Sequence, residues 1–466
     1  MRRFSSSRLY STLRGLTPRR YAGRARRRAT TAAVALVCVA SLACGCAATR
    51  PAPADAAYGA PIQINTPQGL RAKQTMDMLN SDWPIGEVGV RTLAAPEAVE
   101  HVGVTLDRIW WDRPFTVTNV DVGAGHAKLD VLTSYGVAQT IELRTDEAGM
   151  VDRFQVQLVP PKIATWSDID EQLTKSGARY SYQVAKVTDG QCVKVAGTNT
   201  DTSLPLASIF KLYVLFAVAE AVKADTLEWT DALTITEGAK AVGSSAFDEL
   251  EPGATVSVRE AAQQMISASD NMATDLLIER LGPGAIERAL VAAGHHDPAS
   301  MTPFPTMHEL FSVGWGTPDL REQWKRATRE GRAQLLQQTN SRPYEPDPKR
   351  THLPASDIGA EWYGSAADIC RLHAALQKGA VGEAAPVRDI LSAVPGIDLD
   401  RDEWPYIGAK AGNLPGDLTF SWYAVDASGQ PWVVSLQSNW PEFRSQTAAA
   451  WLMSIARQTF DLVPNG

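Results

Sequence analysis

Residues 205–219 constrain the fold of this chain more than any other segment. They are apolar around almost the whole circumference of a helix, so such a helix must lie inside the protein. Lys211 interrupts the apolar run in what would be its first turn. A buried ammonium group is costly unless it is paired or loses its proton. The segment therefore predicts a central buried helix that keeps one lysine for a chemical purpose.

Ser208 precedes Lys211 by three residues and would lie on the same helix face, one turn away. A desolvated lysine with a lowered pKa accepts the proton of a neighbouring serine, which creates a nucleophile without histidine. The amino end of the helix adds unpaired amides where an oxyanion would form. For an isolated Ser-x-x-Lys match, a lysine that extends from a helix end to solvent is the alternative interpretation.

Two later segments favour the catalytic interpretation of Ser208 and Lys211 over a lysine that extends to solvent. Residues 269–271 read Ser-Asp-Asn in a polar break between two apolar stretches, and residues 410–412 read Lys-Ala-Gly on a predicted strand. Ser-x-x-Lys, Ser-Asp-Asn and Lys-small-Gly, in this order, are the motif set of the penicillin-recognising serine hydrolases. Over residues 166–460 the chain resembles the class A serine beta-lactamases and, more broadly, the serine D,D-peptidases and esterases of that fold. With its small amino-terminal domain it also resembles actinobacterial lipoproteins such as the serine hydrolase of the clavulanic acid cluster.

The resemblance implies catalytic roles for three residues of these motifs. Ser208 is then the nucleophile and Lys211 its base during acylation. Ser269 relays a proton toward the leaving group. Asp270 is expected to be structural, since an aspartate at a helix start fixes its loop by local hydrogen bonds.

The same resemblance implies four substrate-binding residues. Asn271 holds the substrate amide, and Lys410 supplies positive potential for a substrate carboxylate. Gly412 lets the strand backbone approach the substrate. The amides of Ser208 and Asn413 form the oxyanion hole.

The sequence departs from the class A pattern in the loop that carries the deacylating glutamate. Residues 294–304 contain no Glu, and Glu309 just beyond is expected to be a solvated residue of the next helix. His295, His296 and Asp297 are candidates for activating water, although a role at the loop surface is favoured.

Further departures concern position 411 and an apparent insertion. Alanine at 411 removes a hydroxyl that would contact a substrate carboxylate, and residues 317–340 are predicted to form an inserted, capped and charged helix that covers the site as a lid. These departures argue against rapid beta-lactam hydrolysis and leave acylation as the expected step.

The amino terminus predicts export. Residues 1–50 hold 11 of the 45 basic residues and none of the 52 acids, and an apolar run follows at 32–43. That run is shorter than the ~20 residues a membrane-spanning helix needs, so residues 1–45 are interpreted as a signal peptide. Cys44 or Cys46 resembles a lipidated cysteine, which would anchor the protein to the outer face of the cytoplasmic membrane. Ordinary cleavage and secretion is the alternative.

Charge and cysteine content exclude several functions. Beyond residue 50 the chain has 34 basic against 52 acidic residues, which argues against nucleic acid as a partner. The seven histidines and the remaining Cys192 and Cys370 form no metal-binding spacing, so we expect neither a metal nor another cofactor. The two cysteines either pair in an oxidising compartment or remain buried thiols.

The first half of the chain predicts a tether followed by a small domain. Residues 46–61 lack apolar periodicity and contain several prolines, which is typical of a linker. Residues 62–160 follow with helical pieces and then strands, as in cystatin-like or NTF2-like cones; the strands are expected at 128–132, 139–144 and 153–158. Asp112, His126 and Asp130 are expected to be solvated residues at strand ends.

Residues 166–466 predict the second domain, so the fold class is α+β. Capping boxes begin helices at residues 257–260 and 365–368. Strands at both ends of this region suggest one antiparallel sheet beside a helical lobe, with the site in the crevice between them. The expected outer elements are a helix near 166–176, strands at 180–187, 192–196, 405–411, 418–425 and 431–438, and a helix at 443–459.

Three functional hypotheses follow. The first is an envelope serine hydrolase that forms an acyl-enzyme with a small beta-lactam, ester or peptide, including cell-wall-derived substrates. The second is a beta-lactamase in the strict sense. The third is a lipoprotein that binds or senses ligands and is acylated without efficient turnover.

Overall fold

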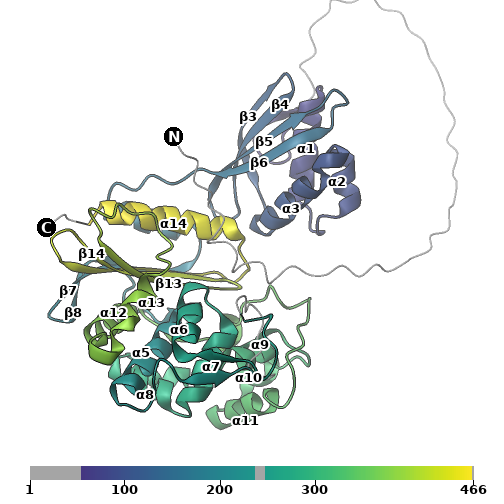
Figure 1. Ribbon diagram of the computed structural model, residues 1–466. Helices are drawn as coiled ribbons and strands as arrows, with labels where there is room; N and C mark the ends of the chain where they lie inside the picture. Colours follow the sequence, from purple (N-terminus) through teal and green to yellow (C-terminus); the bar gives the residue numbers. More distant parts are fainter. Residues whose placement is uncertain (1–53, 237–246, 464–466) are drawn as a thin grey trace, which may run out of the picture.

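The computed structural model describes residues 54–236 and 247–463 (Figure 1). Within these ranges the chain forms two α+β domains, each with its own antiparallel sheet and hydrophobic core. The predicted α+β fold class is confirmed. The expected signal peptide, with Cys44 and Cys46, lies outside the described residues. Within them, no helix combines the length and apolar character needed to cross a bilayer.

The N-terminal domain packs helices against one face of a four-stranded sheet of order β3-β4-β5-β6. Its helices are α1 (Pro67–Leu79), α2 (Glu87–Leu93) and α3 (Val99–Ile109), followed by the short 3-10 turn η3 (Trp110–Asp112). Its strands are β3 (Thr116–Gly123), β4 (His126–Leu132), β5 (Ala138–Thr145) and β6 (Val151–Leu158). Alternate residues of β4 are buried, as in a strand that packs one face on the core.

Residues 54–61, expected to belong to the tether, are instead part of this domain. The short strand β1 (Ala54–Asp55) pairs with β2 (Ile62–Gln63), and the Ala60 amide donates to the Val117 carbonyl of β3 at 2.8 Å. Tyr58 and Ala60 pack against the domain core. These backbone pairs explain why a proline-containing stretch without periodicity is nevertheless ordered.

The C-terminal domain is built on a five-stranded sheet of order β13-β14-β15-β7-β8. Strand β15 near the end of the chain pairs with β7 near the start of the domain, as the sequence predicted. The strands are β7 (Arg179–Thr188), β8 (Gln191–Thr198), β13 (Tyr406–Leu414), β14 (Asp417–Val425) and β15 (Pro431–Asn439). Helices α4 (Trp166–Lys175) and α14 (Gln446–Asp461) pack on one face. Figure 1 shows α14 on this face and the helical lobe on the other.

The lobe surrounds α5 (Lys211–Lys223), in which nearly every side chain is buried. The predicted capping boxes begin α6 (Val258–Ser267) and α12 (Ala366–Gly379). Its other helices are α7 (Asn271–Leu281), α8 (Ala285–Ala292), α9 (Met307–Trp315), α10 (Arg321–Arg326), α11 (Arg329–Thr339) and α13 (Pro386–Ser392), and its short strand pairs are β10 (Ala232–Thr234) with β11 (Thr255–Ser257) and β9 (Leu204–Pro205) with β12 (Tyr363–Gly364).

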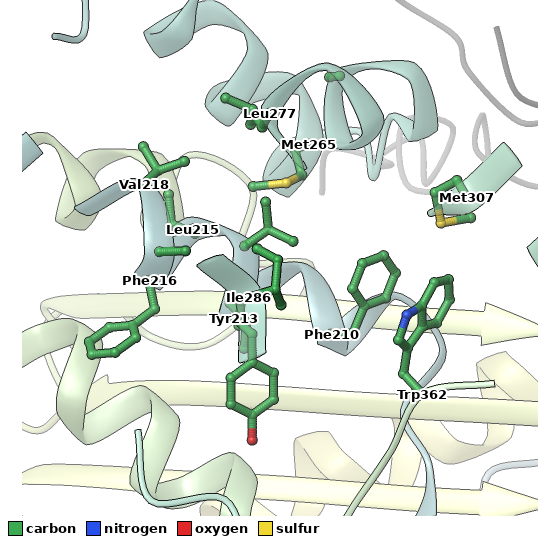
Figure 2. Packing of buried hydrophobic residues seen from close by; sticks show 14 of the residues in the cluster. Phe210, Tyr213, Leu215, Phe216, Val218, Met265, Leu277, Ile286, Met307 and Trp362 are labelled. Atoms are coloured by element: carbon green, nitrogen blue, oxygen red, sulfur yellow. The ribbon is translucent and has the colours of Figure 1, made fainter. Parts of the chain in front are cut away.

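The helix predicted from residue 205 begins only at Lys211. Leu206 donates its amide to the Trp362 carbonyl at 2.8 Å, and Ala207 has a positive φ of 42°, so the α-helical hydrogen-bond pattern cannot start there. The turn η4 (Ala207–Phe210) follows. Phe210 then stacks on Trp362, with ring centroids 3.6 Å apart. Figure 2 shows the two rings next to each other. Ser208 therefore lies in a turn in front of α5.

The segment 317–340 forms two helices, α10 and α11, where one was expected. Thr328 caps the second helix, and Trp324, Leu335 and Leu336 are buried in the core of the lobe. These apolar contacts fix the segment to the lobe, so it is not a free lid.

The structure joins Cys192 of β8 to Cys370 of α12 in a disulfide. The sequence left pairing and buried free thiols open, and the two bonded residues are 178 positions apart. The bond connects the edge strand of the sheet to the helix that packs on it.

The expectation that Asp112 is solvated was wrong. It is fully buried where the two domains meet, and its carboxylate accepts hydrogen bonds from the Ser445 backbone amide at 3.0 Å and from the Ser445 hydroxyl. Burial raises the pKa of Asp112 to about 6. His126 is exposed at the start of β4, as expected, whereas Asp130 lies inside β4, is only partly exposed and accepts a hydrogen bond from Asn119 Nδ2 at 3.0 Å.

Candidate active site

The three sequence motifs meet between the lobe and the edge of the sheet. Ser208 is partly exposed in η4, whereas Lys211, at the start of α5, is completely buried. Ser269 lies in the link between α6 and α7 and has a positive φ of 56°. Together with Ala207, this puts two non-glycine residues in the left-handed region beside the candidate nucleophile, where backbone strain commonly marks function.

Lys211 is the centre of the hydrogen-bond network. Its Nζ donates to the Ser269 carbonyl and to Asn271 Oδ1, both at 2.6 Å, and to Ser269 Oγ at 3.2 Å. Burial lowers the pKa of Lys211 to about 7, against the opposing charges of Asp270 and Asp275. Because this pKa lies close to neutral, the ammonium that makes these three contacts can lose one proton and then accept another from a hydroxyl.

Lys410 of β13 reaches the same serine from the other side. Its Nζ donates to Ser269 Oγ at 2.9 Å and to its neighbour, the Ala411 carbonyl. Burial, and then the charge of Lys211, hold the pKa of Lys410 well below its usual value. The Ser269 hydroxyl therefore bridges two amines, an arrangement that can pass a proton between them.

Gly412 brings β13 against the turn that carries Ser208. A Cβ atom at this position would lie 2.6 Å from the Ser208 nitrogen and 2.8 Å from the Leu206 carbonyl oxygen. Only glycine permits this approach. It places the backbone of residues 412–413 beside the Ser208 amide, which is the arrangement that an oxyanion hole requires. The side chain of Asn413 is exposed.

Sequence reasoning missed the side chains that support β13 from beneath. Ser421 Oγ donates to the Lys410 carbonyl at 3.2 Å, so the hydrogen bond between His373 Nε2 and Ser421 Oγ, at 3.0 Å, has the ring as donor. Burial lowers the pKa of His373 to about 3, which keeps the ring neutral. In the sequence, the only signal of this contact is a serine, Ser421, within a mostly apolar strand.

Asp270 and Asp275 both act as anchors in α7. Asp270 is completely buried and caps the helix by accepting from the Ala273 amide at 2.8 Å, in the structural role expected of it. Asp275 was not predicted. It accepts from the amides of Met307 and His308, at 2.7 and 2.9 Å, which ties α7 to the start of α9. Burial raises the pKa of Asp275 to about 7.

Glu309 is not the solvated residue that the sequence suggested. It is 7% exposed, accepts from the Thr306 amide at 2.8 Å in a capping box, and accepts from Asn340 Nδ2 at 2.6 Å. The contact with Asn340, the residue that caps the end of α11, buries it. Its carboxylate holds the segment 317–340 in place.

His295, His296 and Asp368 come together with potential ligand atoms within 4.8 Å of one another. Both ring nitrogens of His295 are already engaged, because Nδ1 accepts from the Asp297 amide at 3.0 Å and Nε2 lies 2.9 Å from the Tyr363 carbonyl. Burial opposes ionisation of Asp368, but hydrogen bonds from Ser365, the charge of His295 and a hydrogen bond from His296 outweigh it and lower the pKa of Asp368 to about 2. These contacts fit a structural role, in which the carboxylate pins the loop 294–297 to α12.

A partly exposed serine in front of a buried lysine, a second serine shared by two lysines and a glycine-bearing strand against the nucleophile turn form a candidate site of the beta-lactamase type. Sequence comparison agrees with this class. The chain belongs to the beta-lactamase enzyme family, whose model matches residues 164–461. Residues 63–151 match a second model, described as the ORF 12 gene product N-terminal.

Among curated proteins the comparison finds no match. Similar solved structures include a beta-lactamase from Sphaerobacter thermophilus, at 20% identity and a TM-score of 0.44 over 65% of this chain and 100% of that one. The chromosome-encoded beta-lactamase of Vibrio parahaemolyticus has 15% identity and a TM-score of 0.45 over 64% and 99%. A structure of PBP-A has 17% identity and a TM-score of 0.41 over 66% of this chain and 99% of that one.

Proposed function

We propose that this protein is an exported serine hydrolase that forms an acyl-enzyme on Ser208 with a beta-lactam, ester or peptide. The observation that carries the proposal is the buried Lys211 amine, which has a pKa lowered to about 7 and lies one turn after a partly exposed serine. An enzyme of this kind needs no metal or other cofactor, because the lysine supplies the base.

In the proposed acylation, Lys211 takes the hydroxyl proton of Ser208 while Oγ bonds to the substrate carbonyl carbon. The amides of Ser208 and Asn413 hold the oxyanion that develops. As the carbonyl re-forms, the bond from carbon to the leaving nitrogen or oxygen breaks, and the proton passes from Lys211 through Ser269 to the leaving atom. Asn271 and Lys410 position the substrate. Water later attacks the ester and releases Ser208.

The alternative is a penicillin-binding or ligand-sensing lipoprotein that is acylated without efficient turnover. The loop 294–304, without a glutamate, favours it. Just after this loop, the Pro305 carbonyl accepts from Trp362 Nε1 at 3.2 Å, and the Glu309 carboxylate is occupied in its capping box. A strict beta-lactamase would need a group at this loop that activates the deacylating water. We therefore expect slow deacylation of beta-lactams.

Export is part of the same proposal. The disulfide between Cys192 and Cys370 supports an oxidising compartment, since such bonds are rare in the cytosol. We propose that Cys44 or Cys46 is lipidated and anchors the protein to the outer face of the membrane, with secretion as the alternative. The pairing of the two domains supports the resemblance to actinobacterial lipoproteins of the clavulanic acid cluster type.

Intact-mass spectrometry tests the proposal. The protein is incubated with benzylpenicillin and with p-nitrophenyl acetate, beside Ser208→Ala and the control Ser341→Ala, which removes an exposed hydroxyl. We expect an adduct in the wild type and the control but not in Ser208→Ala. Turnover of the ester with a persistent penicillin adduct would support the hydrolase, whereas adducts without any turnover would support the binding protein. No adduct and no turnover that depends on Ser208 would refute both.

A further inference from the structure

Three consecutive residues of the N-terminal domain lie where it meets the C-terminal domain. Trp110 stays with its own domain, because its Nε1 donates to the Ser81 carbonyl at 2.9 Å. Trp111 turns the other way and packs its ring against His352 and Phe443, at centroid distances of 5.1 and 5.3 Å. Asp112 holds the residue that caps α14, as described above. The domain thus inserts one aromatic ring and one carboxylate into its neighbour.

His352 begins a segment, residues 352–362, that runs from this contact toward the active site. The Trp315 ring nitrogen donates to the Leu353 carbonyl at 2.8 Å, and Arg321 Nη2 donates to the Pro354 carbonyl at 2.7 Å. The backbone of the segment is therefore held by α9 and α10 from one side. Trp111 contacts the first residue of the segment, His352, which is partly buried.

Pro354 packs against the turn between β13 and β14. A Cβ atom on Gly416 in that turn would lie 2.9 Å from Pro354 Cγ and 2.6 Å from the Trp440 carbonyl oxygen. Two residues further on, Ser356 Oγ accepts from Asn439 Nδ2 at 3.2 Å. The segment thus supports the end of the strand that carries Lys410 and Asn413.

The far end of the same segment holds the nucleophile turn. The Trp362 carbonyl accepts the Leu206 amide at 2.8 Å, and β12 pairs with β9, which directly precedes this turn. Leu206 lies two residues before Ser208. Both sides of the candidate oxyanion hole, the turn and β13, therefore rest on one segment whose first residue touches Trp111.

We infer that Trp111 is a positioning residue for acylation of Ser208, so that the N-terminal domain completes the active site from outside it. The inference rests on the proposed function. Reacting groups must be held within a fraction of an ångström, and a misplacement of about 1 Å costs on the order of a hundredfold in rate. Removal of the indole takes away the ring that packs on His352 and loosens residues 352–362 against both sides of the site.

The test compares Trp111→Ala with Trp83→Ala in the full protein. Trp83 belongs to the same domain but is 80% exposed, so it matches the chemical change without the contact. Acylation by benzylpenicillin is followed over a range of concentrations, which separates the maximal acylation rate constant from the apparent dissociation constant. We expect the rate constant of Trp111→Ala to fall about tenfold with little change in the dissociation constant, less than the hundredfold or more that loss of an oxyanion donor costs. Trp83→Ala should match the wild type.

His352→Ala tests the same contact from the other domain and decides the question if Trp111→Ala does not fold. It should show the same loss of rate, and the double variant should lose little more than either single variant, because both remove one interaction. A folded Trp111→Ala with the wild-type rate, or losses that simply multiply in the double variant, would overturn the inference and leave the proposed function intact. A wild type without acylation would overturn both.

Discussion

The close approach of β13 to the nucleophile turn gives the sharpest prediction. In Gly412→Ala the new methyl carbon would lie 2.6 Å from the Ser208 nitrogen, 2.8 Å from the Leu206 oxygen and 3.1 Å from Ala207 Cβ. The optimal van der Waals separation of non-bonded heavy atoms is about 3.5 Å, so the strand and the turn must separate by roughly 0.9 Å. All the nearest atoms belong to the turn itself, and the two closest are backbone, so rotation of a side chain cannot relieve the overlap.

We expect Gly412→Ala to lower the rate of Ser208 acylation on the order of a hundredfold, because the two oxyanion donors move apart by nearly an ångström. The free energy of unfolding should fall by only about 1–3 kcal/mol, the usual effect of an added methylene in a packed site. Stopped-flow acylation by benzylpenicillin measures the first quantity, and denaturant unfolding measures the second.

Two other glycines serve as controls for this prediction. A Cβ on Gly408, on the same strand, would lie 2.9 Å from the Tyr406 hydroxyl and 3.1 Å from Leu391 Cβ, so Gly408→Ala strains β13 away from Ser208. A Cβ on Gly86 would have no heavy atom within 4 Å, so Gly86→Ala should be silent. Wild-type acylation in Gly412→Ala, or an equal loss of rate in Gly408→Ala, would refute the placement of the oxyanion hole.

Three further predictions concern protons and the disulfide. Since burial lowers the pKa of Lys211 to about 7, the acylation rate should rise with pH and level off above about pH 7, and a profile still rising steeply at pH 9 would contradict its role as base. Glu361 and Asp417 form a buried carboxyl pair in which burial and mutual repulsion raise the pKa of Glu361, and burial raises the pKa of Asp417 from 3.8 to about 7. Between the unfolded and the native pKa of Asp417, the native state holds more protons than the unfolded chain, so the free energy of unfolding falls as the pH rises. Thermal unfolding of Asp417→Asn should therefore depend less on pH between 5 and 8 than that of the wild type. Reduction of the bond between Cys192 and Cys370, which spans 178 positions, should lower the free energy of unfolding by about 2–5 kcal/mol in urea titrations, and an unchanged midpoint would mean that the bond does not constrain the unfolded chain.

Patterns that repeat along the chain predicted most of the fold. Period-two alternation identified β5 and β6, and capping boxes located the starts of α6 and α12, because both signals are set by neighbouring residues. The motif order also placed Ser208, Lys211 and Ser269 in one region. The pairing of β15 with β7 followed from strands at both ends of the domain.

What the sequence could not predict depends on partners far along the chain. Asp112 and Glu309 were assigned to solvent because their hydrogen-bond donors, Ser445 and Asn340, carry no local signal. The start of α5 was misplaced because Ala207 has a positive φ of 42°, which interrupts a helix and which the sequence does not reveal. A strand position that needs glycine for close contact is likewise invisible until the facing turn is known.

The pairing of β15 with β7 has a consequence for the order in which the chain is made. Asn413 is the last of the proposed site residues along the chain. The middle of the sheet nevertheless forms only when β15, which ends at Asn439, has been synthesised and can pair with β7. A polypeptide truncated at residue 425 would hold every motif and no assembled crevice. The apolar α5 would meanwhile lack the sheet it packs beneath, leaving the unfinished chain prone to aggregation until its final strand arrives.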